Sequence, residues 1–139
     1  MNPICLLMRL KVISKRFGKA GICGGFDQKR KEFPTGLMTK NFNIAIPHAD
    51  PENVNAPFIY ILRLAKPIVV EQMADREKIK VKDVFILGIK DGRKQVDVLA
   101  ALMNLFMNDA FAQDFWQQLQ LKKYLLVLPN IYKLIKKVQ

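Results

Sequence analysis

Runs and alternations of hydrophobic residues divide the middle of the chain into extended and helical segments. Residues 58–64 and 81–89 are short runs rich in β-branched and aromatic side chains, the first of them ending shortly before Pro67. Such runs predict buried strands. Residues 42–46 alternate apolar with polar or small residues and predict a third strand, and residues 68–70 are a candidate for a fourth.

The hydrophobic period changes after Gly92, where apolar residues recur at steps of three and four. This spacing predicts a helix packed on a sheet, with a stripe made of Val96, Leu99, Ala100, Met103 and Phe106. A second helix is predicted over residues 111–119, with Phe111, Phe115, Trp116 and Leu119 on one side. We interpret Met103, Phe106 and Trp116 as core residues. Strands and helices together predict a mixed α/β class.

The two ends of the chain differ from its middle. Residues 5–20 can form a basic amphipathic helix, and three glycines over residues 21–25 interrupt any regular element that follows. The apolar and basic segment 121–138 contains Pro129, which forbids one uninterrupted helix. A length of 139 residues, without an internal repeat or a long linker, predicts a single domain over residues 1–139.

Composition first points to a polyanion as partner, because 23 Lys and Arg face 12 Asp and Glu. The excess lies at the ends, however. Residues 1–40 carry nine basic side chains against Asp27 and Glu32, and residues 122–139 carry five lysines and no acid. Residues 41–121 carry nine basic and ten acidic side chains. The middle of the chain therefore lacks the clustered basic groove that would follow a phosphate backbone, and we expect no nucleic-acid partner.

The inventory of reactive side chains excludes several other classes of protein. Cys5 and Cys23 do not form a Cys-x-x-Cys pair, and His48 is the only histidine, so the sequence predicts no metal site and no cofactor. No apolar stretch approaches the roughly 18 to 20 residues of a membrane span, and the first ten residues lack a cleavage pattern. We expect reduced thiols and a cytoplasmic location.

His48 is the strongest candidate for chemistry. It follows the strand predicted over residues 42–46 directly, at a turn that contains Pro47 and Pro51. Its imidazole suits general acid or base chemistry or nucleophilic attack by a ring nitrogen. Upstream, a turn at Thr35 and Gly36 can supply hydroxyl and backbone N–H donors to an anion.

The sequences Phe-Pro-Thr-Gly-Leu at 33–37 and Ile-Pro-His-Ala at 46–49 resemble the Enzyme IIA domains of the fructose-mannitol class. These domains belong to the bacterial phosphoenolpyruvate-dependent sugar phosphotransferase system. The resemblance continues through the predicted strands to Val98-Leu99-x-x-Leu102 and covers residues 29–120, leaving an atypical region 1–28 and a basic segment 121–139. It implies a mixed β-sheet flanked by helices on both faces.

The spacing and the absence of a second histidine are most similar to the galactitol-type branch. Mannitol-type and fructose-type members usually have a histidine where Gln95 stands here. Two further departures are Lys29 and Arg30, which stand where the family usually has Arg-Glu, and Asn53, which stands where many relatives have a histidine. Lysine is not an equivalent replacement for an arginine that binds phosphate.

The resemblance implies a phosphohistidine at His48. The imidazole would accept the phosphoryl group from the carrier HPr and pass it to a cysteine of Enzyme IIB, the partner of the membrane protein Enzyme IIC. Thr35, Gly36 and Gln95 stand where they could support the phosphate, and Lys29 and Arg30 could supply positive charge.

Two alternatives stay open from the sequence. A regulatory protein of the same fold would signal by contact with a partner. A basic protein would use its two ends on nucleic acid or a membrane surface, and that binding would weaken steeply with salt.

Overall fold

A computed structural model of the chain describes residues 34–40 and 42–120. These residues belong to two compact units. The first contains the described residues up to Met38 together with Asn43–Gly92, and the second contains Thr39–Phe42 and the residues from Arg93 onward. The helix predicted over residues 5–20, the segment 121–138 and both cysteines lie outside the described residues.

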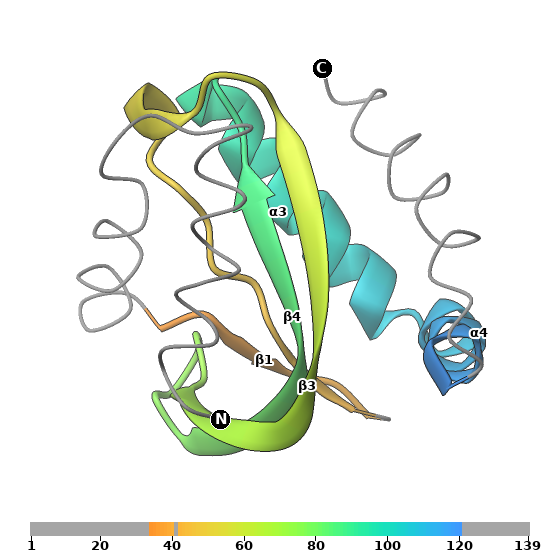
Figure 1. The fold of residues 1–139 in the computed structure, drawn as a ribbon. Coiled ribbons are helices and arrows are strands. Elements are labelled where there is room, and N and C mark those ends of the chain that lie inside the picture. The colour runs from red at the N-terminus through yellow and green to blue at the C-terminus, as the bar shows by residue number, and fades with distance from the viewer. Residues whose placement is uncertain (1–33, 41, 121–139) are drawn as a thin grey trace. The chain divides into compact units, whose positions relative to one another are not determined.

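The first unit is built on a mixed sheet of four strands in the order β1-β2-β4-β3 (Figure 1). The strands are β1 Gly36–Met38, β2 Asn43–Ala45, β3 Phe58–Glu71 and β4 Lys78–Gly88. β1 pairs antiparallel with β2, β2 pairs parallel with β4, and β4 pairs antiparallel with β3. The predicted α/β class and the mixed sheet are confirmed, whereas helices on both faces stay a prediction.

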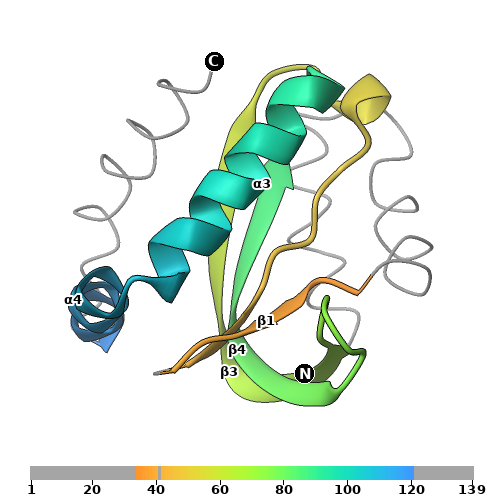
Figure 2. The same cartoon turned by 180° about the vertical axis from the view of Figure 1, so that it is seen from behind.

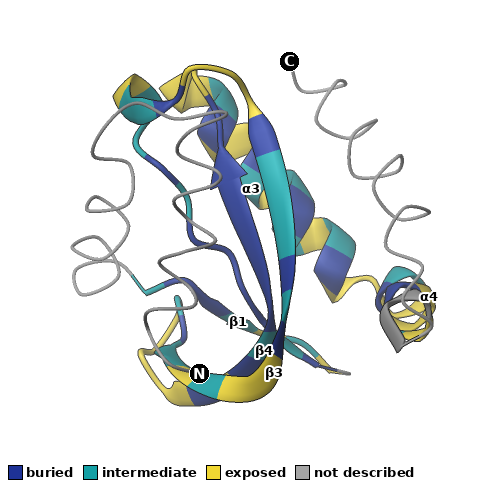
Figure 3. Ribbon diagram, viewed as in Figure 1, coloured by how far each residue is buried: buried dark blue, intermediate teal, exposed yellow. Residues whose placement is uncertain are grey.

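β4 is the buried centre of this sheet. Every residue from Asp83 to Gly88 is buried, as the continuous dark blue of this strand shows in Figure 3. A strand that is covered on both faces has a nearly continuous apolar sequence, and Val84-Phe-Ile-Leu is such a run. The strand predicted over residues 81–89 is confirmed, although it begins three residues earlier, at Lys78, and ends at Gly88.

β3 corrects the prediction of two separate strands at 58–64 and 68–70. It continues past Pro67 as one strand of 14 residues, with a register shift between Arg63 and Ile68. Ala65, Lys66 and Pro67 are exposed at this irregularity. β3 is at the edge of the sheet that the described strands form, and a proline is tolerated at a bulge on an edge strand because its missing N–H is not needed for strand pairing there.

Apolar side chains from both halves of the β3–β4 hairpin belong to one core cluster. Its buried members are Ala45, Ala49, Val54, Phe58, Leu62, Leu64, Ile79, Val81, Val84 and Ile86. The cluster also takes in side chains on both sides of the register shift, since Ile68 and Val70 pack against it. The irregularity therefore bends the hairpin without dividing its core.

The far end of the hairpin reaches β1. Gln72 forms a parallel bridge with Gly36, and the Met73 N–H donates to the Gly36 carbonyl at 2.8 Å. A Cβ at Gly36 would lie 2.7 Å from the carbonyl oxygen of Glu71. The sequence predicted a turn at Thr35 and Gly36, and this was wrong, because Gly36 begins a strand that lies between β2 and the hairpin end.

Hydrogen bonds to one carboxylate hold the turn that closes this hairpin. Oδ1 of Asp75 accepts from Gln72 Nε2 at 2.8 Å and from the Glu77 N–H at 2.9 Å. These two bonds, the backbone one first, lower the pKa of Asp75 below its ordinary value. Arg76 adopts φ 61° in the same turn, a conformation that residues other than glycine seldom take.

Two helices make up most of the second unit. α3 spans Gly92–Met107 and α4 spans Asp109–Gln120, with the short connection at Asn108 (Figure 2). Both predicted helices are confirmed, but the stripe predicted on the first was only partly right. Phe106 is buried as predicted, Leu99 and Met103 are half-buried, and Val96 and Ala100 are exposed. The other buried side chains of α3 are Gln95, Val98 and Leu102.

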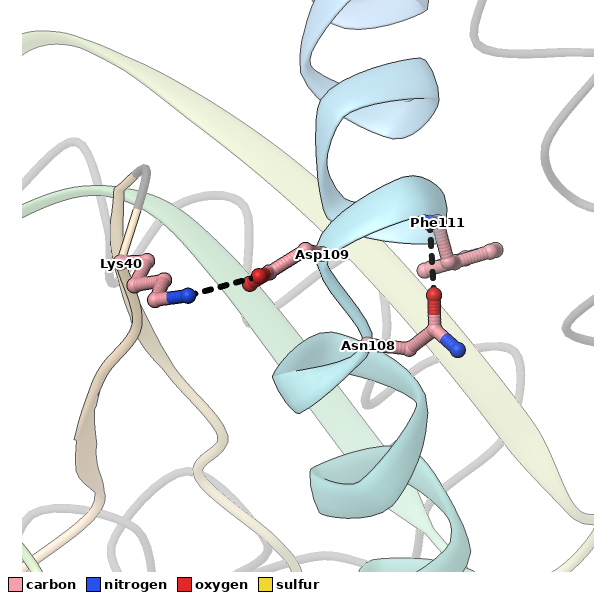
Figure 4. A network of polar contacts seen from close by, with 4 residues as sticks. All are labelled: Lys40, Asn108, Asp109 and Phe111. Carbon is pink, nitrogen blue, oxygen red and sulfur yellow. Dashed lines mark hydrogen bonds and ion pairs between the residues drawn. The ribbon is translucent and has the colours of Figure 1, made fainter.

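The loop between β1 and β2 belongs to the helical unit. The Phe42 ring stacks on Trp116 at a centroid distance of 5.4 Å and on Phe115 at 6.0 Å. Beside it, Lys40 Nζ forms an ion pair with Asp109 Oδ2 at 2.8 Å, which raises the pKa of Lys40 (Figure 4). Aromatic packing rather than this exposed ion pair is the main stabilising contact.

We predict that Gly36→Ala destabilises the protein by about 1–3 kcal/mol, because the new methyl group would press on a strand backbone that cannot move alone. Urea unfolding of the variant and the parent chain measures this difference.

Gly92→Ala is the matched control, because a Cβ there would meet only Pro51 Cγ at an ordinary contact distance of 3.5 Å. It should change the free energy of unfolding little. Equal effects of the two substitutions would contradict the close approach of the hairpin to β1.

Candidate functional site

The backbone around His48 is held by β4. β2 ends at Ala45, but its parallel pairing continues in the same register to a bridge between His48 and Leu87. The Ala49 N–H donates to the Leu87 carbonyl at 2.9 Å, and the Leu87 N–H donates to the Pro47 carbonyl at 2.9 Å. The two residues that flank His48 are therefore both fixed to the central strand.

The imidazole of His48 is half-buried, and its Nδ1 lies 3.4 Å from the carbonyl oxygen of Ile46. A carbonyl oxygen only accepts hydrogen bonds, so this contact is a hydrogen bond in the tautomer that carries its hydrogen on Nδ1. In that tautomer the lone pair available for nucleophilic attack is on Nε2.

The chain after His48 returns to the core within one short turn. Pro51–Asn53 form a 3-10 helix, in which the Asn53 N–H donates to the Asp50 carbonyl at 2.9 Å. Ala49 on one side of this helix and Val54 on the other are buried in the core cluster. His48 thus lies on a short connection that is anchored at both ends.

Thr35 is the predicted site residue that the structure brings next to this segment. Its carbonyl accepts from the Ile46 N–H at 2.8 Å, and its side chain is buried. Residues opposite each other in an antiparallel pair share a face, so Thr35 and Ile46 do so. His48, two residues beyond Ile46, is the diagonal neighbour, and such neighbours typically lie about 7–8 Å apart.

The other predicted supporting residues are placed differently. Gly36 belongs to the same unit, where its carbonyl accepts from the turn after β3. Gln95 is a buried residue of the helical unit, and its Oε1 has no hydrogen-bond partner among the described residues. Lys29 and Arg30 lie outside the described residues. Of the predicted site residues, Thr35 and Gly36 are thus the described ones that belong to the same unit as His48.

A buried carboxylate on β4 was not singled out from the sequence. Asp83 is directly opposite Arg63 of β3, and Arg63 Nε lies 3.6 Å from Asp83 Oδ1. This distance allows charge attraction but no hydrogen bond, and Oδ1 has no hydrogen-bond partner among the described residues. Burial raises the pKa of Asp83, while the charges of Arg63 and Lys82 oppose that rise. An acidic residue next to a run of apolar residues is the sequence signal that could have identified Asp83.

Within residues 34–40 and 42–120, no group of three or more His, Cys, Asp or Glu side chains could hold a metal ion. No helix in the same ranges is long and apolar enough to cross a membrane.

The fold and the site define an α/β protein with a mixed sheet and a histidine held at the end of one strand. Comparison with known sequences identifies its family. The sequence model described as "Phosphoenolpyruvate-dependent sugar phosphotransferase system, EIIA 2" matches residues 24–128. The chain belongs to this family.

Relatives and solved structures agree with this assignment. The chain is 28% identical over 98 residues to the "PTS system galactitol-specific EIIA component" of Escherichia coli K12 and of Escherichia coli O157:H7. The match covers 69% of this chain and 65% of the length of each relative.

Two solved structures share the fold. One, from Streptococcus mutans, is assigned as a PTS IIA (PtxA), with a TM-score of 0.53, 20% identity and coverage of 73% of this chain and 63% of the other. A domain from Streptococcus pyogenes M1 GAS, assigned as PTS IIA, has a TM-score of 0.54, 16% identity and coverage of 91% and 75%. Both confirm the α/β fold.

We predict that Asp83 makes the stability of the protein depend on pH in an unusual direction. Because its folded pKa is raised above the ordinary 3.8, the folded state holds a proton that the unfolded state has lost between these two pKa values. Relative to Asp83→Asn, the parent chain should therefore gain stability as the pH falls through this window.

Urea unfolding of both proteins at several pH values from 7 down to 4 measures this difference. A constant difference would show that attraction to Arg63 and Lys82 cancels the effect of burial, and a change in the opposite direction would show that attraction outweighs it; both results contradict the prediction.

Proposed function

We propose that this chain is the phosphoryl-transfer component, Enzyme IIA, of a phosphoenolpyruvate-dependent sugar phosphotransferase system. It accepts a phosphoryl group from phospho-HPr on His48 and passes it to a cysteine of Enzyme IIB. HPr and Enzyme IIB are thus its direct partners, and Enzyme IIC is an indirect one. The proposal requires neither a metal nor an organic cofactor.

The observation that carries this proposal is the environment of His48. The ring projects from a backbone that two hydrogen bonds tie to Leu87, and its Nδ1 faces the Ile46 carbonyl. A nucleophile that must meet phosphorus in line benefits from such fixed geometry, because orientation is established before the donor arrives.

The first transfer forms one bond and breaks one. The lone pair on Nε2 of His48 attacks the phosphorus of phospho-HPr, and the P–N bond of the donor breaks with its electron pair returning to the donor imidazole. His48 keeps its hydrogen on Nδ1, so the phosphorylated ring carries positive charge. The Ile46 carbonyl faces that N–H and stabilises the charge.

The second transfer reverses these roles. A thiolate of Enzyme IIB attacks the phosphorus, the P–N bond to Nε2 breaks, and its electron pair returns to the ring of His48. A cationic ring is a good leaving group, so the hydrogen on Nδ1 assists this step as well. The imidazole is regenerated in the tautomer from which it started.

The transferred group needs hydrogen-bond donors because its charge is spread over three oxygens in the transition state. Thr35 supplies a hydroxyl from the position directly before β1, and the hydrogen bond between its carbonyl and the Ile46 N–H supports this role. Gly36 supports the site by allowing β1 to approach the hairpin. Gln95, Lys29 and Arg30 complete the proposed phosphate-binding residues.

Two finer assignments belong to the same proposal. The sugar system is of galactitol type, which is supported by the relatives named as galactitol-specific components. The chain acts in the cytoplasm, where HPr would donate. Enzyme IIA does not contact the sugar in this scheme, so the sugar is determined by its partners.

We predict that incubation with phosphoenolpyruvate, Enzyme I and HPr gives an acid-labile phosphate on the protein, and that His48→Ala abolishes it. Thr35→Val should slow the transfer by about 10²-fold, because one donor to the developing charge is lost. Thr35→Ser keeps the hydroxyl and should retain most of the rate. Radiolabelled phosphate and intact-protein mass spectrometry measure both effects.

Phosphate that persists in His48→Ala would overturn the proposal. Normal phosphorylation without transfer to a galactitol-type Enzyme IIB would favour the regulatory alternative. Equal rates for Thr35→Val and the parent chain would remove Thr35 from the site.

A further inference from the structure

The turn between β3 and β4 contacts β1 at Gly36, the residue directly after Thr35, although Gln72 of this turn lies 36 positions further along the chain. Gln72 bridges to Gly36, the residue that directly follows Thr35. The Met73 N–H donates to the Gly36 carbonyl at 2.8 Å. On its other edge, the Thr35 carbonyl accepts from the Ile46 N–H. The strand beside His48 is therefore held between β2 and this turn.

Side chains of the turn determine where its backbone lies. Gln72 is buried, and its Nε2 donates to Asp75 Oδ1 at 2.8 Å. The same oxygen accepts from the Glu77 N–H, and the Gln72 N–H donates to the Glu77 carbonyl at 2.9 Å. One carboxylate oxygen thus ties together both ends of the turn at the point where it meets Gly36.

We propose that Gln72 and Asp75 are positioning residues that set the position of Thr35 relative to the ring of His48. The inference rests on the proposed function for its catalytic consequence. Neither side chain contacts the phosphoryl group in this account. They act through the backbone of Gly36, whose missing side chain allows the hairpin to approach β1 so closely.

A short strand needs such support. β1 has only three residues, and its pairing with β2 covers three positions. Without the turn, one edge of β1 would lose its backbone partner at Gly36, and Thr35 would follow the fluctuations of the strand end. A displacement of about 1 Å can cost about 10²-fold in a transfer that depends on orientation.

Four variants distinguish the loss of the hydrogen bonds to Asp75 from a general loss of stability. Asp75→Ala removes the acceptor of both bonds, whereas Asp75→Asn keeps an oxygen at the same place. Gln72→Ala removes one donor and leaves the bond from Glu77 to Asp75. Lys78→Ala is the matched control, because Lys78 is an exposed residue at the start of β4.

Two measurements are made on the full chain. The first, on unphosphorylated protein, follows the amide resonances of Thr35 and Gly36 and the ring nitrogens of His48. Asp75→Ala and Gln72→Ala should shift them, and the other two variants should not. The second measures kcat and KM for phospho-HPr. Asp75→Ala should lower kcat by about tenfold to 10²-fold with little change in KM, and Asp75→Asn should stay within about twofold.

Unchanged resonances of Thr35 and His48 in Gln72→Ala and Asp75→Ala would overturn the proposal, as would a loss of kcat in Asp75→Asn equal to that in Asp75→Ala. If Asp75→Ala does not fold, Gln72→Ala decides. If the parent chain accepts no phosphate, the proposed function fails, and the resonances still decide whether the turn positions Thr35.

Discussion

Two backbone hydrogen bonds with Leu87, one accepted by the Pro47 carbonyl and one donated by the Ala49 N–H, hold the backbone on both sides of His48. Leu87 is fully buried and belongs to β4, which pairs with both β2 and β3, and buried strands are the segments that open least readily. Loops normally carry reactive groups at the cost of mobility. Here the connection that follows β2 stays hydrogen-bonded to β4 as far as Ala49. The ring is therefore held by the sheet, and its orientation toward the proposed donor is established before the encounter.

The elements with the strongest local patterns were predicted from the sequence. β4 and the two helices have long apolar runs or a clear period of three and four residues, and both signals are local. β1 was missed because three residues that include Gly36 give no periodic signal, and a glycine favours a turn in isolation. The continuation of β3 past Pro67 depends on its place at the sheet edge, which no local pattern contains. The buried side of α3 differed from the prediction at its start, where the polar Gln95 is buried and the apolar Val96 is exposed.

The sequence was sufficient to propose the reactive side chain of the candidate site, but not the backbone contacts that hold it in place. A single histidine after a predicted strand identifies the reactive group, and the resemblance of residues 33–37 and 46–49 adds Thr35. The pairing of His48 with Leu87 joins positions 39 apart in the chain, and the contact of Gln72 with Gly36 spans 36. Such contacts follow from the register of the whole sheet, which the residues near His48 do not encode. The polar residues among positions 72–77 are typical of a turn, but the sequence does not show that this turn contacts Gly36.

The most direct measurement of the central claim is a nitrogen-15 spectrum of the phosphorylated protein labelled at histidine. The chain has one histidine, so the spectrum contains one ring. Our account predicts phosphorus coupling to Nε2 of His48 and a hydrogen on Nδ1. Coupling to Nδ1, or a phosphorylated protein with no coupling to either ring nitrogen, would contradict it.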